Sequence, residues 1–188
     1  VKRMNNELGI GARHITISTV GLAPRIRKLA DEDIQVGLAV SLHQPSNDKR
    51  SALMPINERY DLEELMDSIR YYISKTNRRV SFEFALIRGE TDTIKVATEL
   101  GQLLQGMLCH VNVIPLNPTD GYGGKPSPKL VVDAFIERLA DFGVTCTPRT
   151  RRGIDIDAGC GQLKSELIKK KNKKSITTSE EDDDNVIM

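Results

Sequence analysis

The sequence predicts an α/β protein with a mainly parallel sheet. Segments with strand character alternate with segments of helical periodicity along the first 149 residues. Residues 36–42 form a nearly continuous apolar run, typical of a strand that is buried on both faces of a parallel sheet. Asp61 precedes apolar residues at helical spacing, and Asp61 with Glu64 has the spacing of a capping box. Strands joined through helices make right-handed crossovers, so they run parallel.

The expected elements follow in a regular β-α order. We expect strands at residues 13–19, 36–42, 79–87, 110–116 and 144–149, and helices at residues 25–30, 61–75, 93–104 and 129–142. Ser127 and Pro128 are placed to begin the last of these helices, and Ile94 is expected to face the core from the third. Residues 1–11 are expected to end a helix, and another helix is expected near residues 161–170. This order fits either an open doubly wound sheet or a barrel.

Composition indicates one domain followed by a charged tail. The chain has 188 residues, of which 39% are hydrophobic, and no apolar run approaches the roughly 20 residues needed to span a bilayer. Residues 1–163 are expected to form the domain. Residues 164–188 hold a lysine-rich run and then an acidic block, so we expect a terminal helix and a disordered tail there. The three cysteines are widely spaced, which favours a reducing compartment over a disulfide scaffold.

One loop, residues 153–163, has the composition of a reactive thiol site. Cys160 lies between two glycines, which allow close approach of a ligand, and Arg149, Arg151 and Arg152 precede it. Nearby guanidinium groups favour the thiolate form of a cysteine. A small buried cysteine in a loop is the alternative reading of the same residues.

Polar residues also follow the predicted strands. They are Ser18 near the end of the first strand, Ser41 and His43 at the end of the second, and Asn117 after the fourth. Because the carboxyl ends of parallel strands meet at one edge of a sheet, these side chains should gather where ligands bind. Taken singly, each could also serve only as a local turn former or a backbone hydrogen-bond partner.

Several stretches in order resemble one enzyme family. They are residues 12–19, 39–43, 53–57, 80–87, 110–118 and, most specifically, Asp-Ile-Asp-Ala-Gly-Cys-Gly-Gln-Leu at 155–163. Together they resemble the radical S-adenosylmethionine (SAM) enzymes that methylate adenine at carbon 2 in rRNA and tRNA. The resemblance implies the C-terminal part of a radical-SAM partial (β/α)6 barrel, with the first two core strands absent from this sequence.

The resemblance also implies roles for individual residues. Cys160 would be catalytic, as the carrier of a methyl group. The expected SAM-binding residues are Ser18, Ser41, Leu42, His43 and Asn117. A [4Fe–4S] cluster is implied too, but its C-x3-C-x2-C ligand motif would precede Val1. We therefore expect an N-terminal part to be missing, no metal ligands within these 188 residues, and no activity from this chain alone.

The resemblance further implies rRNA and tRNA as partners and a reductant protein for the cluster, with no membrane association and a monomeric state. We expect a cytoplasmic location, with an organelle as an alternative because the N-terminus is absent. Arg149, Arg151 and Arg152 are candidates for contacting RNA phosphates. Two other readings stay open: a carbon-8 adenine methyltransferase of the same superfamily, and a non-catalytic RNA-binding remnant.

Overall fold

The computed structural model describes residues 2–116 and 124–149, and these residues contain a five-stranded sheet with its strands in the order β1-β2-β3-β4-β5. They fall within one compact unit. The strands are β1 (Thr16–Thr19), β2 (Gly37–Ser41), β3 (Val80–Leu86), β4 (Cys109–Pro115) and β5 (Cys146–Pro148). The helices are α1 (Lys2–Asn6), α2 (Ala23–Ala30), α3 (Asn47–Leu53), α4 (Leu62–Thr76), α5 (Ile94–Leu104) and α6 (Lys129–Ala140), with 3-10 turns η1 (Ala12–His14) and η2 (Pro55–Glu58).

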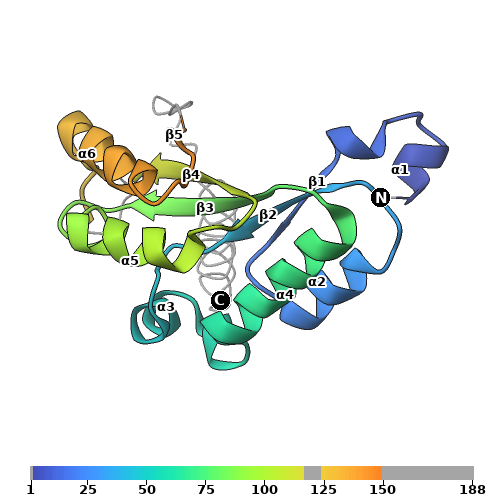
Figure 1. Ribbon diagram of the computed structural model, residues 1–188, viewed down its shortest axis with the longest axis horizontal. Coiled ribbons are helices and arrows are strands. Elements are labelled where there is room, and N and C mark those ends of the chain that lie inside the picture. Colours follow the sequence, from blue (N-terminus) through green and yellow to red (C-terminus); the bar gives the residue numbers. More distant parts are fainter. Residues whose placement is uncertain (1, 117–123, 150–188) are drawn as a thin grey trace, which may run out of the picture. The chain divides into compact units, whose positions relative to one another are not determined.

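All neighbouring strands pair in parallel, and strands that follow one another in the sequence are neighbours in the sheet. The connecting helices α2, α4, α5 and α6 lie on one face of this sheet (Figure 1). A doubly wound sheet reverses its strand order and carries helices on both faces. Sequential order with one helical layer is instead the winding of a barrel wall, so the barrel alternative is the correct one.

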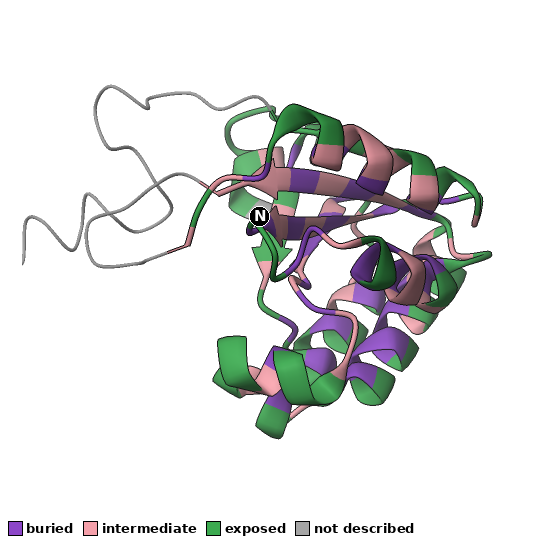
Figure 2. Cartoon of the chain, turned by 90° about the vertical axis from the view of Figure 1, so that its left-hand side faces the viewer, coloured by how far each residue is buried: buried purple, intermediate pink, exposed green. Residues whose placement is uncertain are grey.

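Each strand divides its side chains between the two faces of the sheet. In β3, the buried residues Val80, Phe82, Phe84 and Leu86 alternate with half-buried ones. The buried set packs against the helices in one hydrophobic cluster, and Figure 2 shows the buried residues lining the contact between helices and sheet. Fully burying one such side chain contributes about 1.5–3 kcal/mol. The opposite side of the sheet, here called the open face, therefore receives the other residues of each strand.

Register identifies the residues of the open face. Ser18 aligns with Ala39, and Ser41 aligns with Glu83, which in turn aligns with Asn112. In a parallel sheet, aligned residues point to the same face. The open face therefore carries Ser18, Ala39, Ser41, Ser81, Glu83, Ala85, His110 and Asn112.

Local signals explain the main helix boundaries. The Asp61 side chain accepts a hydrogen bond from the backbone N–H of Glu64 at 2.8 Å, so it caps α4 as predicted. This helix ends at Asn77, whose φ of 50° is left-handed. The Tyr72 hydroxyl donates to the backbone oxygen of Val36 at 2.7 Å, which fixes α4 against the start of β2.

Three local predictions were wrong, and one structured segment was not predicted. Residues 12–14 form a 3-10 turn, so the first strand begins only at Thr16. No element was predicted between residues 43 and 60, where the structure contains α3 and η2. Ser127 does not cap α6, because Pro128 occupies the cap position. Ile94 is 51% exposed, since it lies on the first turn of α5 and the core contact is made by Val96 instead.

A buried arginine on α3 ties the carboxyl ends of β1 and β2 together. Arg50 is 0% exposed. Its Nη2 donates to the backbone oxygens of Val20 at 2.8 Å and Ser41 at 3.3 Å, and its Nε donates to that of Leu42 at 3.2 Å. Nη1 donates to Asn57 Oδ1 at 2.8 Å. One side chain thus satisfies carbonyl groups that follow two different strands.

Asn57 extends this network to α4. Its Nδ2 lies 2.9 Å from Ser51 Oγ and 3.1 Å from Asn47 Oδ1, and the latter also accepts from the backbone N–H of Leu62 at 2.9 Å. Gly21 approaches the same guanidinium, where a Cβ atom would lie 3.0 Å from Arg50 Nη2, and its φ of +109° disfavours any other residue.

None of the helices in the described part of the chain has both the length and the apolar character that crossing a membrane demands.

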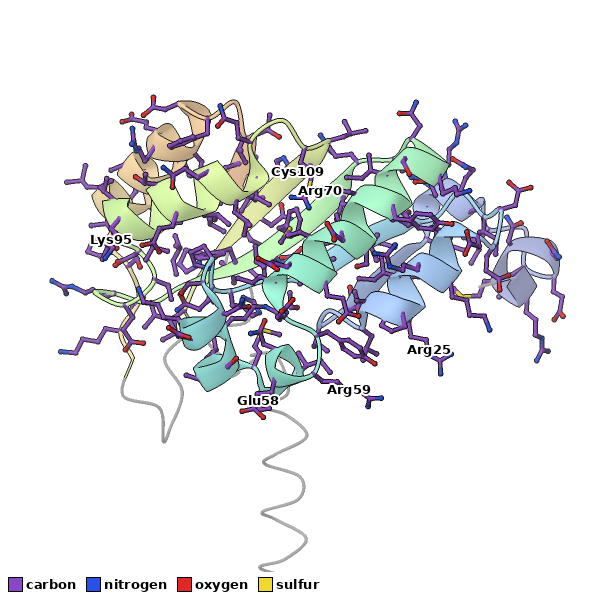
Figure 3. The ribbon with its side chains drawn as sticks, turned by 60° about the horizontal axis from the view of Figure 1, so that its bottom comes forward. Arg25, Glu58, Arg59, Arg70, Lys95 and Cys109 are labelled. Atoms are coloured by element: carbon purple, nitrogen blue, oxygen red, sulfur yellow. The ribbon has the colours of Figure 1, made fainter. Side chains whose placement is uncertain are left out.

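We predict that Arg50→Met lowers the free energy of unfolding by about 3 kcal/mol, because buried carbonyl oxygens lose their donors, each at a cost of about 1–3 kcal/mol. Arg59→Met is the matched control, since the Arg59 side chain extends into solvent (Figure 3) and should change stability by less than about 0.5 kcal/mol. Denaturant unfolding measures both. Equal stability of the two variants would contradict the role given to Arg50.

Candidate functional site

The predicted binding residues of β1 and β2 lie together at the carboxyl edge of the sheet. Ser18 is exposed at the end of β1, while Ser41 and His43 are half-buried at and just after the end of β2. Leu42 is 0% exposed and packs in the core. Any contact that Leu42 makes with a ligand therefore has to come from its backbone, whose N–H already donates to the backbone oxygen of Glu83 at 3.1 Å.

His43 is held as a neutral imidazole with a defined tautomer. Its backbone has a φ of 58°, and its Nδ1 accepts a hydrogen bond from the backbone N–H of Ala85 at 3.1 Å. Burial lowers the pKa of His43, the Arg50 cation lowers it further, and Glu83 acts in the opposite direction. Because Nδ1 is an acceptor, the proton of the neutral ring is on Nε2. His43 can therefore donate one hydrogen bond to a ligand.

A row of polar side chains crosses the open face beside His43. Ser41, Glu83, Asn112 and Thr147 align in register on β2, β3, β4 and β5. Glu83 Oε1 accepts from Asn112 Nδ2 at 2.9 Å, and the Thr147 hydroxyl lies 3.4 Å from Asn112 Oδ1. Glu83 Oε2 is buried and has no hydrogen-bond partner among the described residues. This row, here called the carboxylate row, places one negative charge in the middle of the face.

Arg149 reaches this row from the end of β5. Its backbone N–H donates to the backbone oxygen of Val113 at 2.8 Å, and its Nη1 lies 3.7 Å from Glu83 Oε2. The side chain of Arg149 is 67% exposed. The residue named as a phosphate contact thus also has an acidic neighbour, which reduces the charge it presents to an anion.

The two described cysteines are poor nucleophiles. Burial raises the pKa of Cys109 to about 11 and that of Cys146 to about 12. Cys109 lies in the core beneath the helices (Figure 3). Since the thiolate is the reactive form, neither is suited to attack at neutral pH. Cys160 and Asn117, with Arg151 and Arg152, lie outside the described residues, and so do the expected final helix and tail.

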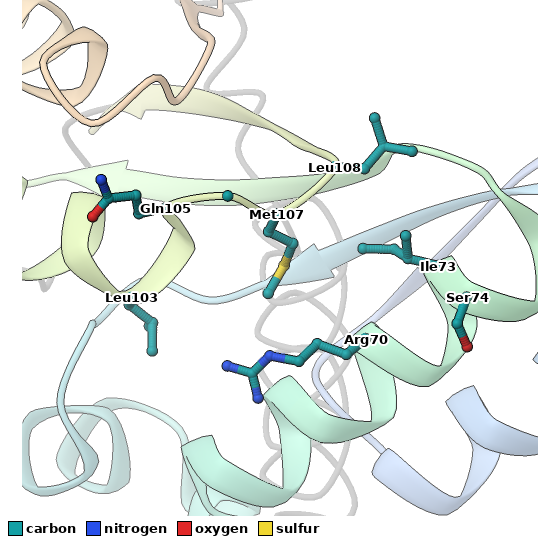
Figure 4. A pocket seen from close by; sticks show the side chains of 8 residues that line it. Arg70, Ile73, Ser74, Leu103, Gln105, Met107 and Leu108 are labelled. Carbon is teal, nitrogen blue, oxygen red and sulfur yellow. The ribbon is translucent and has the colours of Figure 1, made fainter.

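Two surface depressions lie apart from these residues. One has a volume of about 260 Å³ and lies between α4 and the chain leading into β4, at the amino-terminal edge of the sheet (Figure 4). Its lining includes Arg70, Ile73, Leu103 and Met107. The second, of about 490 Å³, lies between the first turns of α5 and α6 and is largely apolar. Neither is lined by Ser18, Ser41, Leu42 or His43.

Sequence reasoning did not single out Arg50 or Glu83. A signal for Glu83 is present: it is one acid in the middle of a strand whose alternate residues, Val80, Phe82 and Phe84, are apolar. Asn57 ends one of the stretches that carry the family resemblance, but its hydrogen bonds to α3 could not be read from the sequence. Within residues 2–116 and 124–149, no group of three or more His, Cys, Asp or Glu residues could hold a metal ion.

Comparison with individual known proteins gives consistent matches, whereas no family model matches the chain. It is 51% identical over 172 residues to a probable dual-specificity RNA methyltransferase RlmN of Caldanaerobacter subterraneus, covering 90% of this chain and 50% of that protein. It is 55% identical over 163 residues to the dual-specificity RNA methyltransferase RlmN 1 of Myxococcus xanthus, covering 87% and 45%. The chain thus spans about half the length of the curated relatives it matches.

Solved structures agree with this match. The crystal structure of a radical SAM methyltransferase from Sphaerobacter thermophilus superposes with a TM-score of 0.81 at 47% identity, over 85% of this chain and 47% of that one. A domain of pyruvate-formate lyase-activating enzyme from Bacteroides vulgatus superposes with a TM-score of 0.57 at 16% identity, over 72% of this chain and 80% of that one. The second likeness concerns the fold alone.

We predict that His43→Asn makes stability less dependent on pH. The pKa of His43 is lowered by folding, so below about pH 6.5 the unfolded chain binds more protons than the folded one, and stability falls as the pH falls. Asn keeps an acceptor for the Ala85 N–H, tolerates positive φ and does not titrate.

The free energy of unfolding, measured between pH 7.5 and 5, should therefore fall less in His43→Asn than in the unsubstituted protein. The exposed His14 provides the control substitution, His14→Asn. Parallel pH profiles for the unsubstituted protein and His43→Asn would show that His43 is not held neutral.

Proposed function

Since the chain belongs to the dual-specificity RNA methyltransferase family, about half of whose length it spans, we propose that it forms part of an enzyme that methylates carbon 2 of adenine in rRNA and tRNA. The observation that carries this proposal is the 47% identity and common fold with a radical SAM methyltransferase. The polar residues at the carboxyl edge supply the place where a ligand would bind.

The residues at this edge fit SAM. Ser18 and Ser41 offer hydroxyl groups, and His43 offers one N–H donor. Glu83 Oε2 is a buried acceptor without a hydrogen-bond partner among the described residues. SAM carries hydroxyl, amino and carboxylate groups as well as positive charge, so directed polar contacts of these kinds suit it. In this proposal Ser18, Ser41 and His43 bind and orient SAM, and Arg50 holds the two strand ends at a fixed separation.

A [4Fe–4S] cluster has no fitting ligand set among the described residues. Cluster ligation needs several thiolates close together, and the cysteines of this chain are separated by 37 and 14 residues. In this proposal the cluster ligands belong to the part of the longer enzyme that this chain does not span. SAM and the cluster, when bound, supply the radical chemistry that methylation of a non-nucleophilic carbon requires.

Cys160 is proposed as the group that carries the methyl to the RNA. Its thiolate would take the methyl group of SAM by displacing S-adenosylhomocysteine, and the flanking glycines, which carry no side chains, would leave room for the SAM and the RNA base to approach in turn. The raised pKa values of Cys109 and Cys146 argue against either of them in this role.

RNA would be held through its phosphates by Arg149, Arg151 and Arg152. Of these, Arg149 is 67% exposed and remains accessible despite its acidic neighbour. The proposal includes a reductant protein as a further partner, a monomeric enzyme, and a cytoplasmic location, with an organelle as the alternative.

We predict that RNA from cells expressing the full-length protein contains more 2-methyladenosine than RNA from cells lacking it, as measured by nucleoside mass spectrometry. Methylation at carbon 2 is the outcome that the family membership leads us to expect. The appearance of 8-methyladenosine without 2-methyladenosine would assign the carbon-8 reaction instead, and the absence of both would reject the enzyme.

We predict that Cys160→Ala in the full-length enzyme abolishes RNA methylation while cluster absorbance is retained. Methylation per enzyme should fall by at least a thousandfold, because the methyl carrier itself is removed. Cys146→Ser is the matched control and should keep methylation, since burial holds its thiol in the protonated form. Product formation by Cys160→Ala would remove Cys160 from the reaction.

A further inference from the structure

We infer that Glu83 is a further SAM-binding residue, whose Oε2 atom accepts a hydrogen bond from an N–H or O–H group of SAM. This inference rests on the proposed function, because it names a residue of the same site. Glu83 belongs to none of the positions to which the family resemblance assigned a role.

Position is the first argument. Glu83 is the Cα partner of Ser41 in the pairing of β2 with β3, so both side chains point to the open face. Ala85, the next residue of β3 on that face, holds the His43 ring through its backbone N–H. Directly paired residues in adjacent strands have Cβ atoms about 5 Å apart. A ligand that contacts Ser41 and His43 therefore lies within reach of the Glu83 carboxylate.

Unsatisfied hydrogen bonding is the second argument. Oε1 of Glu83 has a partner in Asn112 Nδ2, whereas Oε2 is buried and accepts no hydrogen bond in the described part of the chain. A buried acceptor without a hydrogen-bond partner destabilises the protein, and more so when it is charged. A ligand donor at Oε2 removes this cost, so the site is more complete with a ligand than without one.

A purely structural ion pair with Arg149 explains less. The Nη1–Oε2 distance of 3.7 Å exceeds that of a hydrogen bond, and the Arg149 side chain is 67% exposed. An ion pair whose cation is largely in solvent contributes little to stability, and less than the cost of a buried carboxylate oxygen that accepts no hydrogen bond. Arg149 therefore does not account for a carboxylate in the middle of this strand.

Ligand chemistry matches the acceptor. The ribose hydroxyls, the α-ammonium and the adenine amino group of SAM are all donors, and a carboxylate only accepts. Hydrogen bonds to an ionised group are also stronger than those between neutral groups. Ser41 and His43 supply donors at this place, and Glu83 supplies a complementary acceptor beside them.

The test is the binding of SAM and S-adenosylhomocysteine to the full-length protein with its cluster reconstituted, measured by calorimetry for the unsubstituted protein and Glu83→Gln. Gln preserves the shape and the acceptor for Asn112 but replaces the free oxygen with a donor. We expect Kd to rise at least tenfold for both ligands, because S-adenosylhomocysteine keeps every N–H and O–H group of SAM. Ser81→Ala is the control, because Ser81 lies on the same face two residues closer to the amino end of β3. It should leave both Kd values within twofold.

The outcomes separate clearly. An unchanged Kd in Glu83→Gln, with the unsubstituted protein binding SAM, overturns this inference and leaves the proposed function standing. If Glu83→Gln weakens the binding of SAM but not that of S-adenosylhomocysteine, the carboxylate attracts the sulfonium charge of SAM. That result overturns the inferred hydrogen bond. If the unsubstituted protein binds neither ligand, the proposed function fails as well.

Thermal unfolding without ligand checks that Glu83→Gln is folded. If it is unfolded, Glu83→Asp is measured instead: its shorter carboxylate should still raise both Kd values, and unchanged values overturn the inference.

Discussion

The site depends on one buried cation. Arg50 donates to backbone oxygens that follow β1 and β2, and all four of its hydrogen bonds go to neutral oxygens of Val20, Ser41, Leu42 and Asn57. Burial lowers the pKa of Arg50, which is the cost of keeping a guanidinium out of water. These hydrogen bonds hold the ends of β1 and β2 in place, next to Ser18, Ser41 and His43.

The residues that form the core and the polar residues lie on opposite faces of the sheet. Residues facing the helices are apolar and form one core, as Phe82 and Phe84 do on β3. Their neighbours on the open face include Glu83 and, on β4, Asn112, which are joined by a hydrogen bond of 2.9 Å. Substitution of an open-face side chain therefore changes little of the core packing. This separation is why polar and charged residues are tolerated in the middle of central strands.

Much of the fold could be predicted from the sequence, because apolar periodicity and capping residues act locally. The Asp61 cap and the alternation in β3 were both visible. The segment containing α3 was not, since Asn47–Leu53 carries few apolar residues and is held by the tertiary contacts of Arg50. Ser41 and His43 could be placed at the edge from strand polarity alone. The Glu83 oxygen without a hydrogen bond could not be predicted, because it depends on which neighbours the register brings together.

The central claim is that the open face at the carboxyl ends of β1 and β2 binds SAM. Amide hydrogen exchange of the full-length protein, with and without SAM, tests it most directly. The account predicts that SAM slows exchange in residues 41–44 and 83–85, which surround the bond between His43 and Ala85. Protection confined to residues 70–74 and 103–108, which border the depression between α4 and β4, would contradict it.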